Sequence, residues 1–265
     1  MNPGQSDSLT DQVIVVTGGA GLLGRAFVDA IADQGATAVI ATRNLDKAMS
    51  VAEASMADAP GRKIDCIGLD ISDPPSVAEL FPALHETHGR VDALVNNALP
   101  RNDNYGRKFE DVAYADFCEN VDSHLGGYVL MCQAAVKYFT EQAGGNIVNM
   151  GSIYGTIAPH FDVYEDTDMT KEIEYAIAKA GIIHLSQYLA AYCKGRNIRV
   201  NTLSPGGIFD DQPEPFVARY SALCLNKGML APEDVTGALL FLLSDQSKYV
   251  NGHNLVVDDG FLLGP

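Results

Sequence analysis

Short apolar segments alternate with longer amphipathic segments along the whole chain. The apolar segments are rich in β-branched residues and have the length of buried strands. They cover residues 13–16, 37–41, 63–68, 91–96, 146–150, 199–203 and 254–257. Because the intervening segments are amphipathic and long enough for helices, consecutive strands are predicted to be parallel. The pattern predicts an α/β fold of the doubly wound type, in which helices cover both faces of a seven-stranded parallel sheet.

No composition break, linker, repeat or low-complexity tract divides the chain. Its 265 residues exceed the commonest size of one domain, but doubly wound folds of this length can bury a large core. We therefore expect a single domain over residues 1–265.

Composition excludes several classes of partner. The net charge of −16 disfavours nucleic acid and anionic membranes, because both require a basic surface. No apolar run approaches the ~20 residues that span a bilayer, and residues 1–12 lack the layout of a signal peptide, so we expect a cytoplasmic protein. The five cysteines are scattered without CxxC spacing, which predicts reduced thiols and no metal site.

A glycine-rich turn follows the first predicted strand. The segment from Thr17 to Gly24 reads TGGAGLLG and leads into a helical pattern that continues to Ile31. Glycines at such a turn let a pyrophosphate approach the backbone and the positive end of the helix. An ordinary tight connection between strand and helix would look the same.

The second predicted strand ends at Thr42-Arg43-Asn44, where a dinucleotide-binding fold meets the adenosine ribose. An acidic residue there would accept hydrogen bonds from a free 2′-hydroxyl, and none is present. Arg43 can instead pair with a 2′-phosphate, so the sequence favours NADP, with NAD as the alternative. A solvated surface arginine is the simpler interpretation.

Tyr175 is the only one of eleven tyrosines with a lysine four residues later, and it follows Ser152 by 23 residues. On a helix this spacing places Tyr175 and Lys179 on one face. An ammonium ~4 Å away at an effective dielectric of ~20 supplies about 4 kcal/mol. That energy corresponds to the ~3 units needed to bring the pKa of a tyrosine from ~10 to neutrality. We expect acid/base chemistry here, although an amphipathic helix with a packed tyrosine could carry the same pair.

Together these motifs resemble the short-chain dehydrogenase/reductase family over nearly the whole chain. The landmarks are Thr17-Gly18, Leu69-Asp70-Ile71, Asn96-Asn97-Ala98, Ser152, the run from Tyr175 to Lys179, Ser204-Pro205-Gly206 and the run from Val257 to Gly260. The resemblance implies a Rossmann-fold oxidoreductase in which Tyr175 is the acid/base, Lys179 lowers its pKa and holds the nicotinamide ribose, and Ser152 orients the substrate oxygen. It also implies cofactor contacts from Gly18, Gly21, Leu22, Leu23, Arg43, Asp70, Ile71, Asn97, Ala98, Tyr175, Lys179, Pro205 and Ile208.

The chain departs from the family pattern at three places. Leu22 stands where a glycine is usual. The family's helix asparagine, which holds a water behind the lysine, falls on His124, with Asn120 one turn earlier; either could relay protons, or His124 could simply be packed. Asp210 replaces a threonine that often holds the carboxamide.

The segment from Ser152 to Tyr175 is about ten residues longer than is usual in the family, so residues 156–174 are interpreted as an insertion over the site. Its polar residues favour a hydroxyl-rich substrate, unless the loop is merely solvated; they are His160, Asp162, Tyr164, Glu165, Asp166, Asp168 and Lys171. Arg101, Arg107 and Lys108 form a nearby basic cluster that could capture a phosphate, or could be an exposed loop.

The insertion and residues 151–155, 210–216 and 225–230 resemble a narrower group, the flagellin-modification oxidoreductases of bacterial nonulosonic sugar synthesis. This implies an NADP-dependent reaction on a secondary alcohol or ketone of a phosphorylated or nucleotide-linked sugar. The alternatives are a 3-oxoacyl-thioester reductase and a non-catalytic dinucleotide sensor or scaffold. The family likeness also implies a homodimer or homotetramer, with contacts in residues 250–265.

Overall fold

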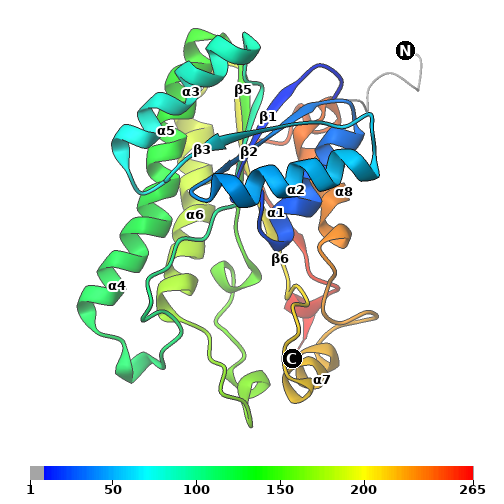
Figure 1. Cartoon of the computed structure of the whole chain (residues 1–265). Helices are drawn as coiled ribbons and strands as arrows, with labels where there is room; N and C mark the ends of the chain where they lie inside the picture. The colour runs from blue at the N-terminus through cyan, green and yellow to red at the C-terminus, as the bar shows by residue number, and fades with distance from the viewer. Residues whose placement is uncertain (1–8, 265) are drawn as a thin grey trace.

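The computed structural model describes residues 9–264 and contains one seven-stranded sheet (Figure 1). The strands are β1 (Val13–Thr17), β2 (Thr37–Thr42), β3 (Lys63–Gly68), β4 (Ala93–Asn96), β5 (Gly145–Met150), β6 (Ile198–Pro205) and β7 (Asn254–Val257). All neighbouring strands are parallel, in the order β3-β2-β1-β4-β5-β6-β7. The predicted doubly wound α/β fold is confirmed. Part of the polar start of the chain, used above for targeting, lies outside the described residues.

The strand order reverses direction beside β1. The chain first moves outward from β1 to β3, then returns to the other side of β1 and moves outward from β4 to β7. Val15 at the centre of β1 pairs with Val39 of β2 and Leu94 of β4. In an open parallel sheet, such a reversal leaves a crevice at the carboxyl ends of the strands.

Helices cover both faces of the sheet because its buried strands are apolar on both sides. The helices are α1 (Leu22–Asp33), α2 (Leu45–Asp58), α3 (Pro74–His88), α4 (Tyr114–Val121), α5 (Gly127–Glu141), α6 (Ile173–Tyr192), α7 (Glu214–Ala222) and α8 (Glu233–Leu243). One buried cluster joins the sheet to α3, α5 and α6, and a second joins it to α1, α2 and α8. Within residues 9–264, no helix has both the length and the apolar character that crossing a membrane requires.

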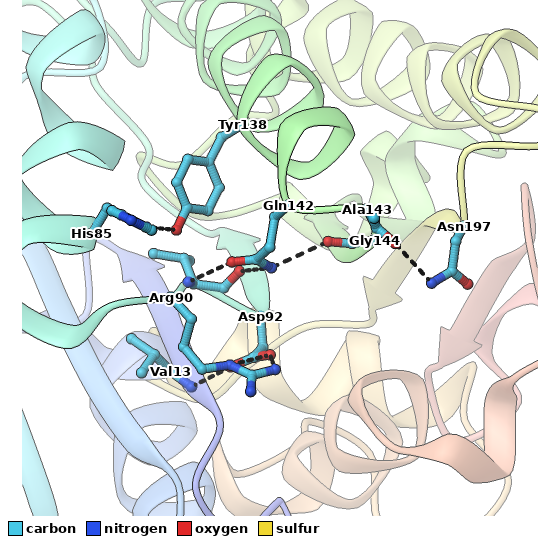
Figure 2. Close-up of polar contacts among 10 residues, drawn as sticks. Val13, His85, Arg90, Asp92, Tyr138, Gln142, Ala143, Gly144 and Asn197 are labelled. Atoms are coloured by element: carbon cyan, nitrogen blue, oxygen red, sulfur yellow. Dashed lines mark hydrogen bonds and ion pairs between the residues drawn. The ribbon is translucent and has the colours of Figure 1, made fainter.

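Polar side chains fasten together the amino-terminal ends of the strands (Figure 2). Asp92 accepts a hydrogen bond from the Val13 backbone at 2.8 Å and pairs with Arg90, which ties the start of β1 to the start of β4. The Gln142 amide accepts from the Val91 backbone N–H at 3.2 Å and donates to the Val91 carbonyl at 2.9 Å. Asn197, before β6, donates to the carbonyl of Ala143. These contacts satisfy backbone groups at the edge opposite the crevice.

A buried polar chain crosses the core behind the carboxyl edge. Asn96 of β4 donates to Asn149 of β5 at 2.9 Å, and Asn149 donates to the Ser186 hydroxyl of α6 at 2.9 Å. Thr202 of β6 donates to the same hydroxyl at 2.7 Å. All four side chains are buried. The chain therefore attaches α6 to three central strands by directional bonds.

Candidate active site

A cavity of about 860 Å³ lies at the carboxyl ends of the strands. It is lined by every residue for which the sequence predicted a catalytic or cofactor contact: Gly18, Gly21, Leu22, Leu23, Arg43, Asp70, Ile71, Asn97, Ala98, Ser152, Tyr175, Lys179, Pro205 and Ile208. These residues come from segments that are far apart in the sequence. The fold thus brings the predicted site residues to one place.

The glycine turn between β1 and α1 is shaped by close backbone contacts. Gly18 has a φ of +66°, and its N–H donates to the Ala41 carbonyl at 2.8 Å. A Cβ on Gly24 would lie 2.3 Å from the Gly18 carbonyl oxygen, so a side chain there would displace the turn. Asn97 closes the other side by donating to the Thr17 carbonyl at 3.0 Å.

The amino terminus of α1 faces this cavity with its backbone N–H groups available. Among the described residues, no side chain caps the helix at Gly21 and no acidic residue occupies its first turn. The first N–H groups of a helix lack partners within the helix, and the helix dipole adds positive potential there. Together with the space left by Gly18 and Gly24, this arrangement fits a phosphate-bearing ligand.

Charged side chains mark the end of the cavity beyond β2. Arg43 and Lys47 both line it, and Arg43 has no ion pair within the described part of the chain. Burial alone would raise the pKa of Asp70, but hydrogen bonds from the Ser72 hydroxyl and N–H, helped by the charge of Arg43, lower it. Arg43 therefore lies near enough to Asp70 to help keep its carboxyl group ionised.

Ser152 is held at the end of β5 by the short helix η3 (Ile153–Gly155). Its hydroxyl oxygen accepts from the Tyr154 backbone N–H at 3.2 Å, and the side chain is buried. A Cβ on Gly155 would lie 2.7 Å from the Lys179 backbone, so this glycine lets η3 pack directly against α6. That close approach brings Ser152 to the helix that carries Tyr175.

Lys179 is buried under the site and donates to the Met150 carbonyl at 2.6 Å. Burial, with a smaller effect from the charge of Lys171, lowers the pKa of Lys179 to about 7. Its ammonium nitrogen is 5.5 Å from the centroid of the Tyr175 ring. The sequence placed both residues correctly on one helix, but the charge of Lys179 is partly lost at neutral pH.

The two alternatives for the helix asparagine lie on different elements: His124 is in a π-helical turn, η2 (Asp122–Gly126), and Asn120 is in α4. His124 is buried with its ring centroid 6.3 Å from that of Tyr175, and its Nε2 has no hydrogen-bond partner among the described residues. Burial and the charge of Lys179 lower the pKa of His124, so the imidazole is neutral. Asn120 instead bonds to Asn102 and Glu174. His124 is the alternative that lies beside Tyr175.

The insertion packs chiefly through aromatic and aliphatic side chains. Tyr154, Tyr164, Phe216 and Tyr220 belong to one buried cluster that joins the insertion to α7. Of the seven polar residues that suggested a hydroxyl-rich substrate, only Tyr164 and Lys171 line the cavity. The expectation that this polar content faces the substrate is wrong for most of them, because Asp162, Glu165, Asp166 and Asp168 are exposed.

The structure separates the residues of the predicted basic cluster from one another, and it leaves Asp210 outside the cavity lining. Arg101 lines the cavity, whereas Arg107 turns to Asn104 and Asp116, and Lys108 does not line it. Asp210 is exposed and outside the cavity lining, and its backbone N–H donates to Gln212, which does line the cavity. The prediction of a basic cluster at the site is therefore correct only for Arg101.

Sequence reasoning overlooked the contact between Lys171 and Tyr175. The Lys171 nitrogen is 4.0 Å from the centroid of the Tyr175 ring, nearer than that of Lys179. Lys171 precedes Tyr175 by four residues, the same spacing that drew attention to Lys179. The four-residue spacing was visible in the sequence. However, Lys171 lies before the first residue of α6, so the spacing of a helix does not apply to it.

Comparison with known proteins gives consistent matches. A family model described as enoyl-(acyl carrier protein) reductase, adh_short_C2, matches residues 18–262. The post-translational flagellin modification protein A of Campylobacter coli is 38% identical over 254 residues, with 96% of this chain and 99% of that protein covered. A 3-oxoacyl-[acyl-carrier-protein] reductase of Thermotoga maritima is 34% identical, with 96% and 99% covered.

Solved structures show the same architecture. A short-chain dehydrogenase from Leptospira borgpetersenii with bound NAD⁺ superposes with a TM-score of 0.83 at 32% identity. The match covers 96% of this chain and 94% of that one.

Proposed function

The chain belongs to the short-chain dehydrogenase/reductase family, and we propose that it is an NADP-dependent oxidoreductase acting on a phosphorylated or nucleotide-linked sugar. The reaction interconverts a secondary alcohol and a ketone. The observation that carries the proposal is the shared cavity, which places Ser152, Tyr175 and Lys179 with the glycine turn of β1 and α1. Acid/base groups and a phosphate cradle in one cavity are what a dinucleotide-dependent hydride transfer needs.

The side chains divide the work of the reaction. A bound nicotinamide supplies the hydride in reduction or takes it up in oxidation. In reduction, the Tyr175 phenol donates a proton to the carbonyl oxygen, and in oxidation the phenolate accepts it back. The Ser152 hydroxyl donates a hydrogen bond to the same oxygen, because its oxygen accepts from the Tyr154 N–H and its proton has no acceptor among the described residues. Lys179, fixed by the Met150 carbonyl, adds positive charge below the phenol whenever it is protonated.

The preference for NADP is supported by Arg43 and Lys47 at the adenosine end of the cavity. Two cationic side chains can pair with a 2′-phosphate. The carboxylate of Asp70 repels a phosphate and therefore opposes this preference. The related Leptospira structure holds NAD⁺, so the choice requires measurement.

The sugar class is supported by the relative that modifies flagellin and by the cavity lining. Arg101 is a cationic side chain in that lining, and it can attract an anionic substituent on the substrate. The relative named as a 3-oxoacyl reductase favours a second candidate, reduction of a 3-oxoacyl thioester. Both candidates use the same three reacting side chains.

The test combines cofactor titration with a substrate panel. We expect NADPH to bind more tightly than NADH, and Arg43→Ala to weaken NADPH binding about tenfold while leaving NADH unchanged. A panel of phosphosugars, nucleotide sugars and a 3-oxoacyl thioester then assigns the substrate. Preference for NADH would overturn the argument from Arg43. Turnover of the thioester alone would favour the second candidate, and binding without any turnover would indicate a dinucleotide sensor.

A further inference from the structure

Lys171 provides a second ammonium at the phenol of Tyr175. Its nitrogen is 4.0 Å from the centroid of the Tyr175 ring and 5.7 Å from that of Tyr154. The side chain is 19% exposed, so it reaches water while its end lies against the ring. Lys171 comes from the insertion, whereas Lys179 comes from α6, so the two cations approach Tyr175 from different elements.

An ammonium in this position interacts differently with the two forms of the phenol. It makes a cation–π contact with the neutral ring. With the phenolate it gains a full charge–charge attraction, which is stronger at these distances in a partly water-excluded site. The contact therefore favours ionisation of the phenol.

Glu172 limits this effect. Its carboxylate oxygen is 3.2 Å from the Lys171 nitrogen, and its side chain is 15% exposed. A negative charge so close offsets part of the positive potential at the ring. Removal of Lys171 and removal of the Glu172 charge should thus act in opposite directions.

Other titratable groups also face Tyr175 from each element packed around it. They are Lys179 of α6, His124 of η2, Tyr128 of α5, Tyr154 of η3, Tyr164 of the insertion, and Tyr105 of the loop after β4. Glu174 precedes Tyr175 on α6, and its carboxylate accepts from the Asn120 amide at 3.4 Å. Burial raises the pKa of each of these four tyrosines, so all four are neutral near pH 7. His124 is neutral as well. The charged side chains near the phenol are therefore Lys171 and Lys179, with Glu172 and Glu174.

We propose that Lys171 is a positioning residue that acts through Tyr175: its ammonium lies over the ring and favours the phenolate, and Glu172 moderates it. The inference rests on the proposed function, because it assigns Tyr175 the acid/base step. It adds that the insertion supplies part of the electrostatic environment for that step.

The test is the pH dependence of alcohol oxidation at saturating cofactor, with the best alcohol from the panel. We expect Lys171→Gln to move the midpoint upward by about one pH unit and to retain the rate at high pH. Glu172→Gln should move it downward by about half a unit, and Lys171→Arg should restore the wild-type midpoint. Lys194→Gln makes the same charge change at an exposed position beyond the far end of α6 and should shift nothing.

A second readout needs no substrate. The ultraviolet difference absorbance of tyrosinate, taken as wild type minus Tyr175→Phe, follows one phenol, and its titration should shift in the same directions. Unchanged midpoints, shifts of equal sign, or a rate reduced equally at every pH would overturn the role of Lys171. If Tyr175→Phe retains turnover, the proposed function fails, whatever the Lys171 variants show.

Discussion

The two edges of the sheet use polar side chains in opposite ways. At the amino-terminal edge, Asp92, Gln142 and Asn197 are bonded to backbone groups (Figure 2). At the carboxyl-terminal edge, the Tyr175 hydroxyl makes no hydrogen bond among the described residues, and Ser152 keeps its hydroxyl proton available. The amino-terminal edge thus uses these polar groups within the protein, whereas the carboxyl-terminal edge leaves the Tyr175 hydroxyl and the Ser152 proton for a ligand.

The two edges also differ in what their polar groups contribute to the free energy of unfolding. Side chain to backbone bonds at the amino-terminal edge satisfy groups that would otherwise lose hydrogen bonds on folding. Burial of Lys179 at the other edge opposes folding, because the charged form loses its hydration. Substitutions at the two edges should therefore separate stability from activity.

The largest expected effect is the loss of turnover in Tyr175→Phe. Without the hydroxyl no proton can be exchanged with the substrate oxygen, so kcat should fall roughly 10³-fold or more. The dissociation constant for NADPH, measured by fluorescence titration, should stay nearly unchanged. Tyr188→Phe removes a hydroxyl from an exposed tyrosine of the same helix and serves as the control. Equal NADPH consumption with and without the Tyr175 hydroxyl would rule out the mechanism.

At the opposite edge, Asp92→Ala should reduce stability and spare catalysis. The substitution leaves the Val13 N–H without its acceptor and removes the partner of Arg90. We expect the free energy of unfolding to fall by about 2 kcal/mol, with kcat per folded enzyme unchanged. Urea denaturation and active-site titration measure the two quantities, and exposed Glu53→Ala should alter neither. A loss of kcat without a loss of stability would contradict the division between the edges.

Lys179→Met should increase the free energy of unfolding of the cofactor-free protein. This effect is opposite in sign to that of Asp92→Ala and smaller. Between pH 7 and the ordinary lysine pKa of 10.5, the unfolded chain holds a proton that folded Lys179 has released, so wild-type stability rises with pH in this range. Lys179→Met removes this dependence. It should be more stable than the wild type by about 1 kcal/mol at pH 6, with the advantage shrinking toward pH 10.

Chemical denaturation at several pH values measures this difference, with exposed Lys194→Met as the control. Turnover of Lys179→Met should be lost even as its stability increases. A variant less stable than the wild type at pH 6 would show that the bond to the Met150 carbonyl outweighs the burial of charge.

The sequence predicted the features that depend on local pattern. Strand positions follow from apolar runs, and the turn at Gly18 and the pairing of Tyr175 with Lys179 follow from short spacings. The fold and the family are confirmed by the structure and the comparisons. The roles of the site residues and the extent of the single domain stay predictions.

Features that depend on contacts between distant segments were not predictable in this way. Asp92 and Val13 are 79 residues apart, and nothing local to either residue indicates their bond. The insertion was judged by its polar composition, but its few apolar residues decide its packing with α7. Lys171 was overlooked because only the tertiary path of the loop places it over Tyr175.

The Ser186 hydroxyl fixes the rotation of α6 about its own axis. Apolar packing alone tolerates a small turn of a helix about its axis, whereas the bonds from Asn149 and Thr202 to Ser186 do not. Ser186 follows Tyr175 by eleven residues, about three turns at 3.6 residues per turn, so both lie on the same side of α6. The direction in which the Tyr175 side chain leaves α6 is thus determined by bonds buried in the protein core.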